Sequence, residues 1–192
     1  GPRVAGLLPW APAGAPYVLY VGPAPPHKNV ETLVRAVAEP QLAGVRLRIA
    51  GSATEAERAA LAELALELGV EVEQLGFVDD AALARLYAGA RVVALPSLHE
   101  GFGLPLLEAL AAGAPVVASA IAAHREVGDD AARYVEDARD PGAWARELAA
   151  AVAGADAAER SAAGLERARA YTWEGAADDL LAVLEEAVAG KP

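Results

Sequence analysis

The stretch RVVALPSLHEGFGLPLLEALAAGAPVVAS, residues 91–119, contains the pattern that decides the fold. It begins with a short apolar run, passes through a loop with two glycines, and continues into an apolar segment with helical character. We predict a strand at 91–97, a helix at 104–113 and a second strand at 114–119. Pro105 falls in the first turn of this helix, where its missing N–H costs little.

The same alternation continues on both sides of this stretch. Before it, we predict strands at 17–22, 45–51 and 72–76 and helices at 29–39, 53–69 and 79–90. After it, we predict a short strand at 132–136 and then helix almost to the end, broken near Gly154 and Thr172. Strand–helix alternation with short apolar strands is typical of a parallel sheet covered on both faces. The predicted fold is therefore α/β, a Rossmann-like doubly wound parallel sheet of about six strands with a helical C-terminal tail.

Three residues mark expected helix ends. Asn29 and Thr54 are suitable N-caps for the helices at 29–39 and 53–69, because their side chains can accept hydrogen bonds from free backbone N–H groups. Gly69 is suited to ending the second of these helices.

Composition limits the class of protein. The chain has 192 residues, of which 55% are hydrophobic, enough for one ordinary domain with a real core. It has no cysteine, which excludes disulfides and thiolate metal sites. No apolar run has the length and purity of a membrane span, and no secretory signal is visible, so we expect a cytoplasmic protein. The net charge of −11 argues against binding nucleic acid through a basic surface, but a local site can still bind an anion.

The first sixteen residues differ from the rest. Gly1-Pro2 resembles a protease-cleavage scar, and residues 3–16 are rich in proline, alanine and glycine. Methionine is absent even at position 1, which suggests an excised or engineered segment. We therefore interpret residues 1–16 as a scar and linker-like lead-in, and residues 17–192 as one ligand-binding domain.

Ligands of open α/β sheets lie beyond the carboxyl ends of the strands. The predicted loop GPAPPHKN, residues 22–29, leaves the first strand and places Lys28 beside a helix N-terminus, which is a place for a phosphate. The alternative is a solvated loop lysine. The loop has neither the P-loop spacing nor Gly-x-Gly-x-x-Gly, which disfavours P-loop nucleotide binding and a nicotinamide dehydrogenase.

A second loop at the same edge, residues 97–105, carries more chemistry. Gly101 and Gly103 are expected to take positive φ and to let the backbone approach a ligand closely. Glu100 lies in the loop and Glu108 lies one turn into the helix, where a carboxylate can accept two hydrogen bonds from a vicinal diol such as a ribose. The alternatives are a loop-stabilising carboxylate at Glu100 and a helix-surface residue at Glu108.

Several segments together resemble one protein family. HEGFGLPLLEALAAGAPVVAS, residues 99–119, resembles the Glu-x7-Glu motif of the group 1 retaining, nucleotide-sugar-dependent glycosyltransferases of the GT-B fold. YVGPAPPHKNVETLVRA resembles the first strand and loop of that family's nucleotide-binding domain. LRIAGSA, QLGFVDDAALARLYAGARVVALPSLHEGFGLP and AHREVGDDAARYVEDARDPGAWARELAAAV follow in the family's order and spacing. The resemblance runs from about residue 17 to the end and implies the donor-binding, C-terminal domain of such a hexosyltransferase.

The resemblance assigns roles to individual residues. It implies catalytic roles for Glu100, beside the transferred hexose, and for Lys28, which would neutralise the departing diphosphate. Glu108 would bind the ribose hydroxyls. The full set of donor-binding residues that it implies is Gly22, Gly76, Phe77, Val78, Gly101, Phe102, Gly103, Leu104 and Glu108.

The resemblance also implies that the substrate is a nucleotide diphosphate sugar and that neither a metal nor a cofactor is needed, in keeping with the absence of an Asp-x-Asp motif at a strand end. One departure concerns the arginine that the family often has after the first-strand glycine. Here Pro23-Ala24 follows Gly22, which leaves one phosphate cation unaccounted for. Arg125 or a residue outside the chain is a candidate. A second departure is AIAAHREV in place of Gly-Gly-x-Pro-Glu, with Glu126 retained.

The largest departure is the missing N-terminal half, which in the family supplies the acceptor site and a histidine near the donor sugar. His27, His99 and His124 do not replace that histidine by position. We therefore expect donor binding with little or no transfer by this chain alone, and the N-terminal acceptor domain as its partner. Two alternatives stay open: a fragment of a GT-B nucleotide-sugar epimerase, and a standalone or engineered non-catalytic module.

Overall fold

A computed structural model of the chain describes residues 8–190, so the scar predicted at residues 1–2 lies outside the described residues. Six parallel strands form one sheet in the order β3-β2-β1-β4-β5-β6. The strands are β1 Tyr17–Val21, β2 Arg46–Ala50, β3 Val72–Gly76, β4 Val92–Leu95, β5 Val116–Ser119 and β6 Ala132–Val135. The predicted doubly wound parallel sheet is confirmed, and each predicted strand lies within a residue or two of its expected place.

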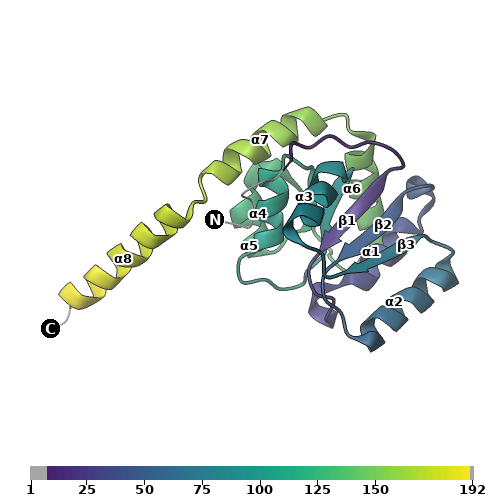
Figure 1. Cartoon of the computed structure of the whole chain (residues 1–192), viewed down its shortest axis with the longest axis horizontal. Coiled ribbons are helices and arrows are strands. Elements are labelled where there is room, and N and C mark those ends of the chain that lie inside the picture. The colour runs from purple at the N-terminus through teal and green to yellow at the C-terminus, as the bar shows by residue number, and fades with distance from the viewer. Residues whose placement is uncertain (1–7, 191–192) are drawn as a thin grey trace.

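Helices cover both faces of the sheet (Figure 1). They are α1 Val30–Val37, α2 Glu55–Leu68, α3 Asp80–Gly89, α4 Leu104–Ala111, α5 Ala122–Gly128, α6 Pro141–Ala153, α7 Ala157–Arg169 and α8 Trp173–Ala189. Helices α1, α2 and α6 pack on one face, and α3 and α4 on the other. The predicted breaks at Gly154 and Thr172 separate α6 from α7 and α7 from α8.

Alternation along the central strand divides the interior into two cores. Val18 and Tyr20 of β1 face α1, α2 and α6, whereas Tyr17 and Leu19 face α3 and α4. All four side chains are buried, because successive side chains of a strand point to opposite faces and both faces are covered here.

The helix ends show which capping predictions hold. Thr54 caps α2 in a capping box with Glu57, and Gly69 ends α2 in a left-handed conformation, as predicted. For Asn29, the predicted position is confirmed, but the predicted side-chain hydrogen bond is not formed. Asn29 occupies the N-cap position of α1 with φ 56°, but its side chain makes no capping hydrogen bond. Its side-chain oxygen instead accepts from the hydroxyl of Thr32 at 2.7 Å, and its amide nitrogen donates to the carbonyls of Pro96 and Ala138, at 3.2 and 2.6 Å.

The described part of the lead-in, residues 8–16, has no regular structure but is hydrogen-bonded to the domain. The Trp10 backbone N–H donates to the carbonyl of Ala112 at 3.1 Å, and its indole N–H donates to that of Ala90 at 2.7 Å. Ala11 donates to the carbonyl of Ala88 at 2.9 Å. This segment therefore lies against the C-terminal ends of α3 and α4.

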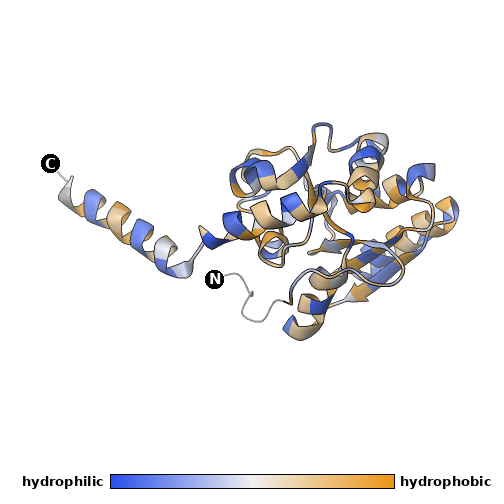
Figure 2. Ribbon diagram, turned by 90° about the horizontal axis from the view of Figure 1, so that it is seen from above, coloured by the Kyte–Doolittle hydropathy of each residue, from blue (hydrophilic) through white to orange (hydrophobic). Residues whose placement is uncertain are grey.

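The last helix differs from the others. Helix α8 extends away from the body of the domain, as Figures 1 and 2 show, and its apolar side chains are exposed. Leu180, Leu184 and Val188, for example, are more than half exposed. Across residues 8–190, no helix has both the length and the apolar character needed to cross a membrane.

Candidate functional site

The strand order of the sheet reverses between β1 and β4, and the loops after these two strands lie side by side. The backbone N–H of Leu98 donates to the carbonyl of His27 at 2.8 Å, which joins the two loops directly. A crevice at this kind of reversal is the usual ligand site of a doubly wound sheet. Both loops that the sequence singled out therefore meet at the expected place.

Lys28 and Glu100 form an ion pair between these two loops. Lys28 Nζ lies 2.5 Å from Glu100 Oε1, although the two residues are 72 positions apart, and each side chain is only 16% exposed. The Ser97 hydroxyl donates to the same carboxylate oxygen at 2.6 Å. Burial alone would raise the pKa of Glu100, but hydrogen bonds from Lys28 and Ser97 and the charge of Lys28 outweigh it and hold this pKa below its ordinary value. Glu100 is therefore a carboxylate at neutral pH.

The Pro-rich loop fixes the backbone that carries Lys28. Pro25 and Pro26 restrict φ, and the N–H of Lys28 donates to the carbonyl of Pro25 at 2.9 Å, within a short 3₁₀ helix, Pro26–Lys28. Asn29 then ties this loop to those after β4 and β6 through its two side-chain hydrogen bonds. The position of the Lys28 backbone is thus set by its immediate neighbours.

The glycine loop turns into α4 at Gly103. This residue has φ 96°, and a Cβ added to it would lie 3.3 Å from Cδ2 of His124, so both the backbone conformation and the tight space favour glycine. The expectation of positive φ was wrong for Gly101, whose φ lies outside the left-handed region. A single left-handed residue next to α4 is enough to make the turn.

The side chains of Phe102 and Leu104 contact the C-terminal helices of the chain. They line a cavity of about 320 Å³ together with Tyr171 and Trp173, at the junction of α7 and α8. The ring of Phe102 makes an edge-to-face contact with that of Tyr171, with ring centroids 5.8 Å apart.

Glu108 is a buried residue, so the helix-surface alternative is wrong. It is 9% exposed, and the hydroxyl of the fully buried Tyr87, on α3, donates to its Oε2 at 2.9 Å. Burial, followed by the negative charge and hydrogen bond of Glu108, raises the pKa of Tyr87 well above its ordinary value. The carboxylate is thus held in a fixed orientation by a hydroxyl that stays protonated.

Three glycines allow the ends of β1, β2 and β3 to approach one another. Gly22 donates to the carbonyl of Ala50 at 2.9 Å, and Gly51 donates to that of Gly76 at 2.8 Å. All three glycines have positive φ, and a Cβ on Gly51 would lie 2.0 Å from the carbonyl oxygen of Gly22. Gly22 therefore serves a close backbone contact, here with Gly51.

The β3 loop lies on the same rim, at one edge of the sheet. Gly76 turns the chain with φ 67°, Phe77 is 80% exposed, and Val78 is half-buried against the core on the α3 and α4 side. The exposed ring of Phe77 offers a stacking surface at the rim.

Three residues to which the sequence assigned no role form hydrogen bonds next to the two loops of the site. The Ser119 hydroxyl, at the end of β5, donates to the carbonyl of Ser97 at 2.5 Å. His124 Nδ1 lies 3.0 Å from the Ser119 carbonyl and 3.1 Å from its hydroxyl, and His124 is 1% exposed. One signal in the sequence could have found Ser97, which is the last residue of a predicted strand and the first of the glycine loop. No signal in the sequence marked His124 as buried, because the charged Arg125 and Glu126 follow it directly.

Arg125 does not join the site. Its guanidinium pairs with the carboxylate of Glu136 and lies 4.9 Å from the ring centroid of Tyr134. Between residues 8 and 190, Arg125 makes no polar contact with Lys28 or Glu100. In the same part of the chain, no group of three or more histidine and acidic side chains is arranged to hold a metal ion.

Comparisons with known proteins show the family to which the chain belongs. The sequence model of the family described as "Glycosyl transferases group 1" matches residues 11–166, which include Lys28, Glu100 and Glu108. The chain is 38% identical over 188 residues to a D-inositol 3-phosphate glycosyltransferase of Salinispora tropica, covering 90% of this chain and 38% of that protein. It is 35% identical over 167 residues to O-antigen chain mannosyltransferase B of Escherichia coli, covering 82% and 42%.

The fold is similar to a solved sucrose-phosphate synthase from Thermosynechococcus elongatus. The TM-score is 0.83 with 32% sequence identity, over 94% of this chain and 47% of that one. The chain thus spans less than half the length of each of these three proteins.

Proposed function

The chain belongs to the group 1 family of glycosyl transferases, and on that premise we propose that residues 17–192 bind the nucleotide-sugar donor of such an enzyme. The observation that carries the proposal is the Lys28–Glu100 pair at the point where the strand order reverses, with the buried Glu108 one turn into α4. The cation and the glycine loop at a helix N-terminus are suited to binding the anionic part of a ligand, and the oriented carboxylate is suited to binding its diol.

In this proposal Lys28 contacts the diphosphate. The negative charge on the leaving diphosphate grows as the bond to the sugar breaks, so a fixed cation stabilises the transition state more than the ground state. The short contact with Glu100 holds the Lys28 ammonium in place before the donor arrives. Lys28 therefore has a catalytic role as well as a binding role.

Glu100 and Glu108 bind the two ends of the donor. Glu108 accepts hydrogen bonds from the ribose hydroxyls, and Tyr87 fixes the orientation of its carboxylate. Glu100 lies beside the hexose, and the backbone of 101–104 holds phosphate and sugar oxygens. The base lies against Gly76, Phe77 and Val78, where the exposed Phe77 ring supplies a stacking surface.

The proposed reaction moves a hexose from the nucleotide diphosphate to an acceptor hydroxyl with retention of anomeric configuration and without a metal. The bond from the anomeric carbon to the diphosphate breaks, a new bond to the acceptor oxygen forms, and the acceptor loses a proton. The acceptor site belongs, in this proposal, to the part of the relatives that this chain does not span. This chain alone therefore binds donor but transfers little.

The test is thermal unfolding in the presence of UDP, GDP, ADP and their sugar conjugates. A ligand at about 100 times its dissociation constant adds about 2.7 kcal/mol to the free energy of unfolding. We expect stabilisation by one nucleotide series, reduced in Lys28→Ala and in Glu108→Gln. Arg35→Ala, which removes an exposed cation from α1, is the matched control and should keep the stabilisation. Absence of stabilisation by every nucleotide would contradict donor binding, and rapid transfer by this chain alone would contradict the need for a second part.

A further inference from the structure

His124 lies directly beneath the glycine loop of the site. Its ring belongs to α5, is 1% exposed, and rests against Gly103, where an added Cβ would lie 3.3 Å from Cδ2 and 3.8 Å from Nε2. The proposed function gives this buried imidazole no task. A titratable group placed so close to the phosphate-binding end of the loop calls for an explanation in terms of charge.

The hydrogen bonds of His124 determine which ring nitrogen carries the proton. Nδ1 lies 3.0 Å from the carbonyl oxygen of Ser119, which can only accept, so we assign the proton of the neutral ring to Nδ1. The Ser119 hydroxyl gives its own proton to the Ser97 carbonyl and therefore accepts from Nδ1. Nε2 is left with a lone pair and has no hydrogen bond to any residue between 8 and 190.

The surroundings of His124 keep it neutral while the site is empty. Burial lowers the pKa of His124, and the hydrogen bond to the Ser119 backbone opposes this in part. Among charged groups, Glu100 raises this pKa and Lys28 lowers it, and the two are paired with each other. The Tyr134 hydroxyl, from β6, donates to the His124 carbonyl, and the neighbouring Arg125 is paired with Glu136.

The site thus lacks positive charge for a diphosphate. Among residues 8–190, Lys28 is the one lysine and is already in contact with a carboxylate, and Arg125 pairs with Glu136. A diphosphate brings two negative charges, and nearby negative charge favours the protonated form of an imidazole. We propose that His124 takes up a proton from solvent at Nε2 when the donor's diphosphate binds over the glycine loop, and so supplies the second positive charge of the site. This inference rests on the proposed donor binding.

The proposal fixes the direction of the pH dependence. The proton is bound more tightly in the complex than in the free protein, so donor affinity rises as pH falls. The gain is complete below the pKa of His124 in the free protein and is lost as pH rises through its pKa in the complex. Folding of the empty protein depends on pH in the opposite sense, because a lowered pKa means that the unfolded chain binds this proton more tightly.

The experiment is calorimetric titration with UDP-glucose and with GDP-mannose between about pH 5.5 and about pH 8. Sugar nucleotides are used because the terminal phosphate of a free nucleoside diphosphate itself titrates near about pH 6. We expect affinity to rise on acidification, by at most about tenfold per pH unit, with uptake of about one proton per ligand in buffers of different ionisation enthalpy. NMR titration of the three histidines should show a raised pKa on binding for His124, with His27 and His99 as internal references.

His124→Asn separates the charge from the structural role. The asparagine amide can take the place of Nδ1 and donate to the Ser119 carbonyl, but it cannot titrate. We expect His124→Asn to lose the pH dependence of affinity and the linked proton uptake, whereas His27→Asn, which removes an exposed imidazole from the same rim, should keep both.

Three other results would contradict the proposed protonation of His124. Binding whose affinity does not change with pH, or an equal pH dependence in His124→Asn, contradicts it and leaves donor binding intact. Absence of binding at every pH contradicts the proposed function and this inference with it. If His124→Asn does not fold, the NMR titration of the unsubstituted chain decides, since an unchanged His124 signal on binding also overturns the proposal.

Discussion

The hydroxyl of Tyr87 donates to Oε2 of Glu108 at 2.9 Å; Tyr87 is fully buried, and Glu108 is 9% exposed. This contact joins α3 to α4 inside the core on that face of the sheet. A carboxylate in such a place has one orientation, and the tyrosine hydroxyl helps to set it. Donor affinity in the proposed site therefore depends on a residue that never touches the donor.

The first prediction concerns Tyr87→Phe. We expect it to lower the free energy of unfolding by about 1.5–3 kcal/mol, because a buried hydrogen bond to a charged group is lost. It should also weaken nucleotide binding, since Glu108 loses its fixed orientation. Thermal unfolding and calorimetry measure the two effects separately. Tyr17→Phe is the matched control, because the Tyr17 hydroxyl donates to the carbonyl of Leu86, outside the site. An equal loss of nucleotide affinity in Tyr17→Phe would show that the effect is general.

The second prediction concerns acid stability through Glu100. Because the pKa of Glu100 is lowered in the folded protein, its stabilisation is present above the ordinary carboxyl pKa and is lost as pH falls through the lowered pKa. We expect Glu100→Gln to be less stable than the unsubstituted protein by about 1–2 kcal/mol at neutral pH, with a gap that closes as pH falls through the lowered pKa of Glu100.

The measurement for Glu100 is the unfolding free energy as a function of pH. Glu166→Gln is the control, because Glu166 pairs with Arg169 at the surface, where both side chains are 75% exposed. Its stability should stay within about 0.5 kcal/mol of the unsubstituted protein. A constant gap between Glu100→Gln and the unsubstituted protein down to low pH would rule out the ionised pair as its source.

The third prediction concerns the backbone contact between Gly51 and Gly22. A Cβ on Gly51 would lie 2.0 Å from the carbonyl oxygen of Gly22, and no side-chain rotation can relieve a clash with backbone. We expect Gly51→Ala to cost more than about 3 kcal/mol and to displace the loop that carries Lys28. Gly44→Ala tests strain alone, since Gly44 also has positive φ but nothing within 4 Å of an added Cβ, and it should cost about 1 kcal/mol. Equal losses for both, measured by chemical denaturation, would contradict the role of crowding.

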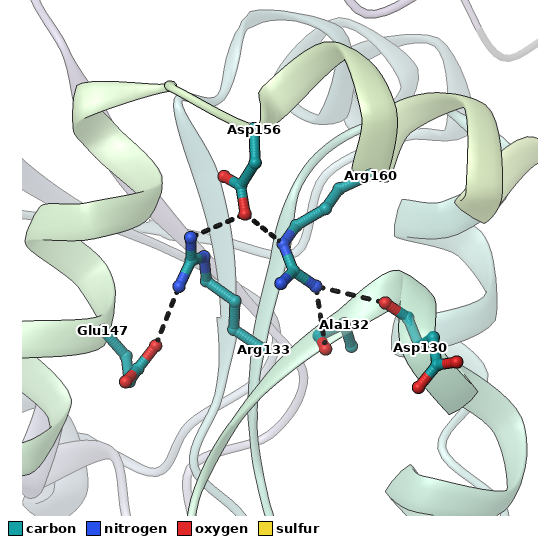
Figure 3. Close-up of polar contacts among 6 residues, drawn as sticks. All are labelled: Asp130, Ala132, Arg133, Glu147, Asp156 and Arg160. Atoms are coloured by element: carbon teal, nitrogen blue, oxygen red, sulfur yellow. Dashed lines mark hydrogen bonds and ion pairs between the residues drawn. The ribbon is translucent and has the colours of Figure 1, made fainter.

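The fourth prediction concerns the ion network that joins α7 to the sheet (Figure 3). Asp156 accepts from Arg160 and Arg133, each at 2.6 Å, and Arg133 also reaches Glu147 at 3.2 Å. Arg160 extends the network to the carbonyls of Asp130 and Ala132, at 3.1 and 3.2 Å. The hydrogen bonds from Arg160 and Arg133 lower the pKa of Asp156, so the network persists well below neutral pH.

We expect Asp156→Asn to lower the free energy of unfolding by about 1–2 kcal/mol, because two guanidinium groups lose their shared carboxylate. Arg169→Ala, which breaks an exposed pair on the same helix, should change it by less than about 0.5 kcal/mol. Hydrogen exchange of α7 measures whether the effect is local. Equal unfolding free energies for Asp156→Asn and Arg169→Ala would show that the network does not stabilise the fold.

Much of the fold could be predicted from the chain itself because its signals are local. Apolar runs of strand length alternate with helical segments, and capping residues such as Thr54 and Gly69 act within one turn of the backbone. The loops with Lys28 and Glu100 could be assigned to one edge of the sheet, because all strands of a parallel sheet end on the same side. Asn29 does occupy the expected N-cap position, but its side chain makes no capping hydrogen bond, because it is engaged with Thr32 and with the carbonyls of Pro96 and Ala138.

The sequence alone thus determined the doubly wound sheet, the two loops at its carboxyl edge, and the positions of Glu100 in one loop and Glu108 in the helix that follows it, since these follow from periodicity and chain order. Only the tertiary structure decided that Lys28 pairs with Glu100, that Tyr87 orients Glu108, and that His124 lies beneath Gly103. These contacts join residues from different elements. Their energies depend on burial and on distances of a few ångströms, which no local pattern encodes.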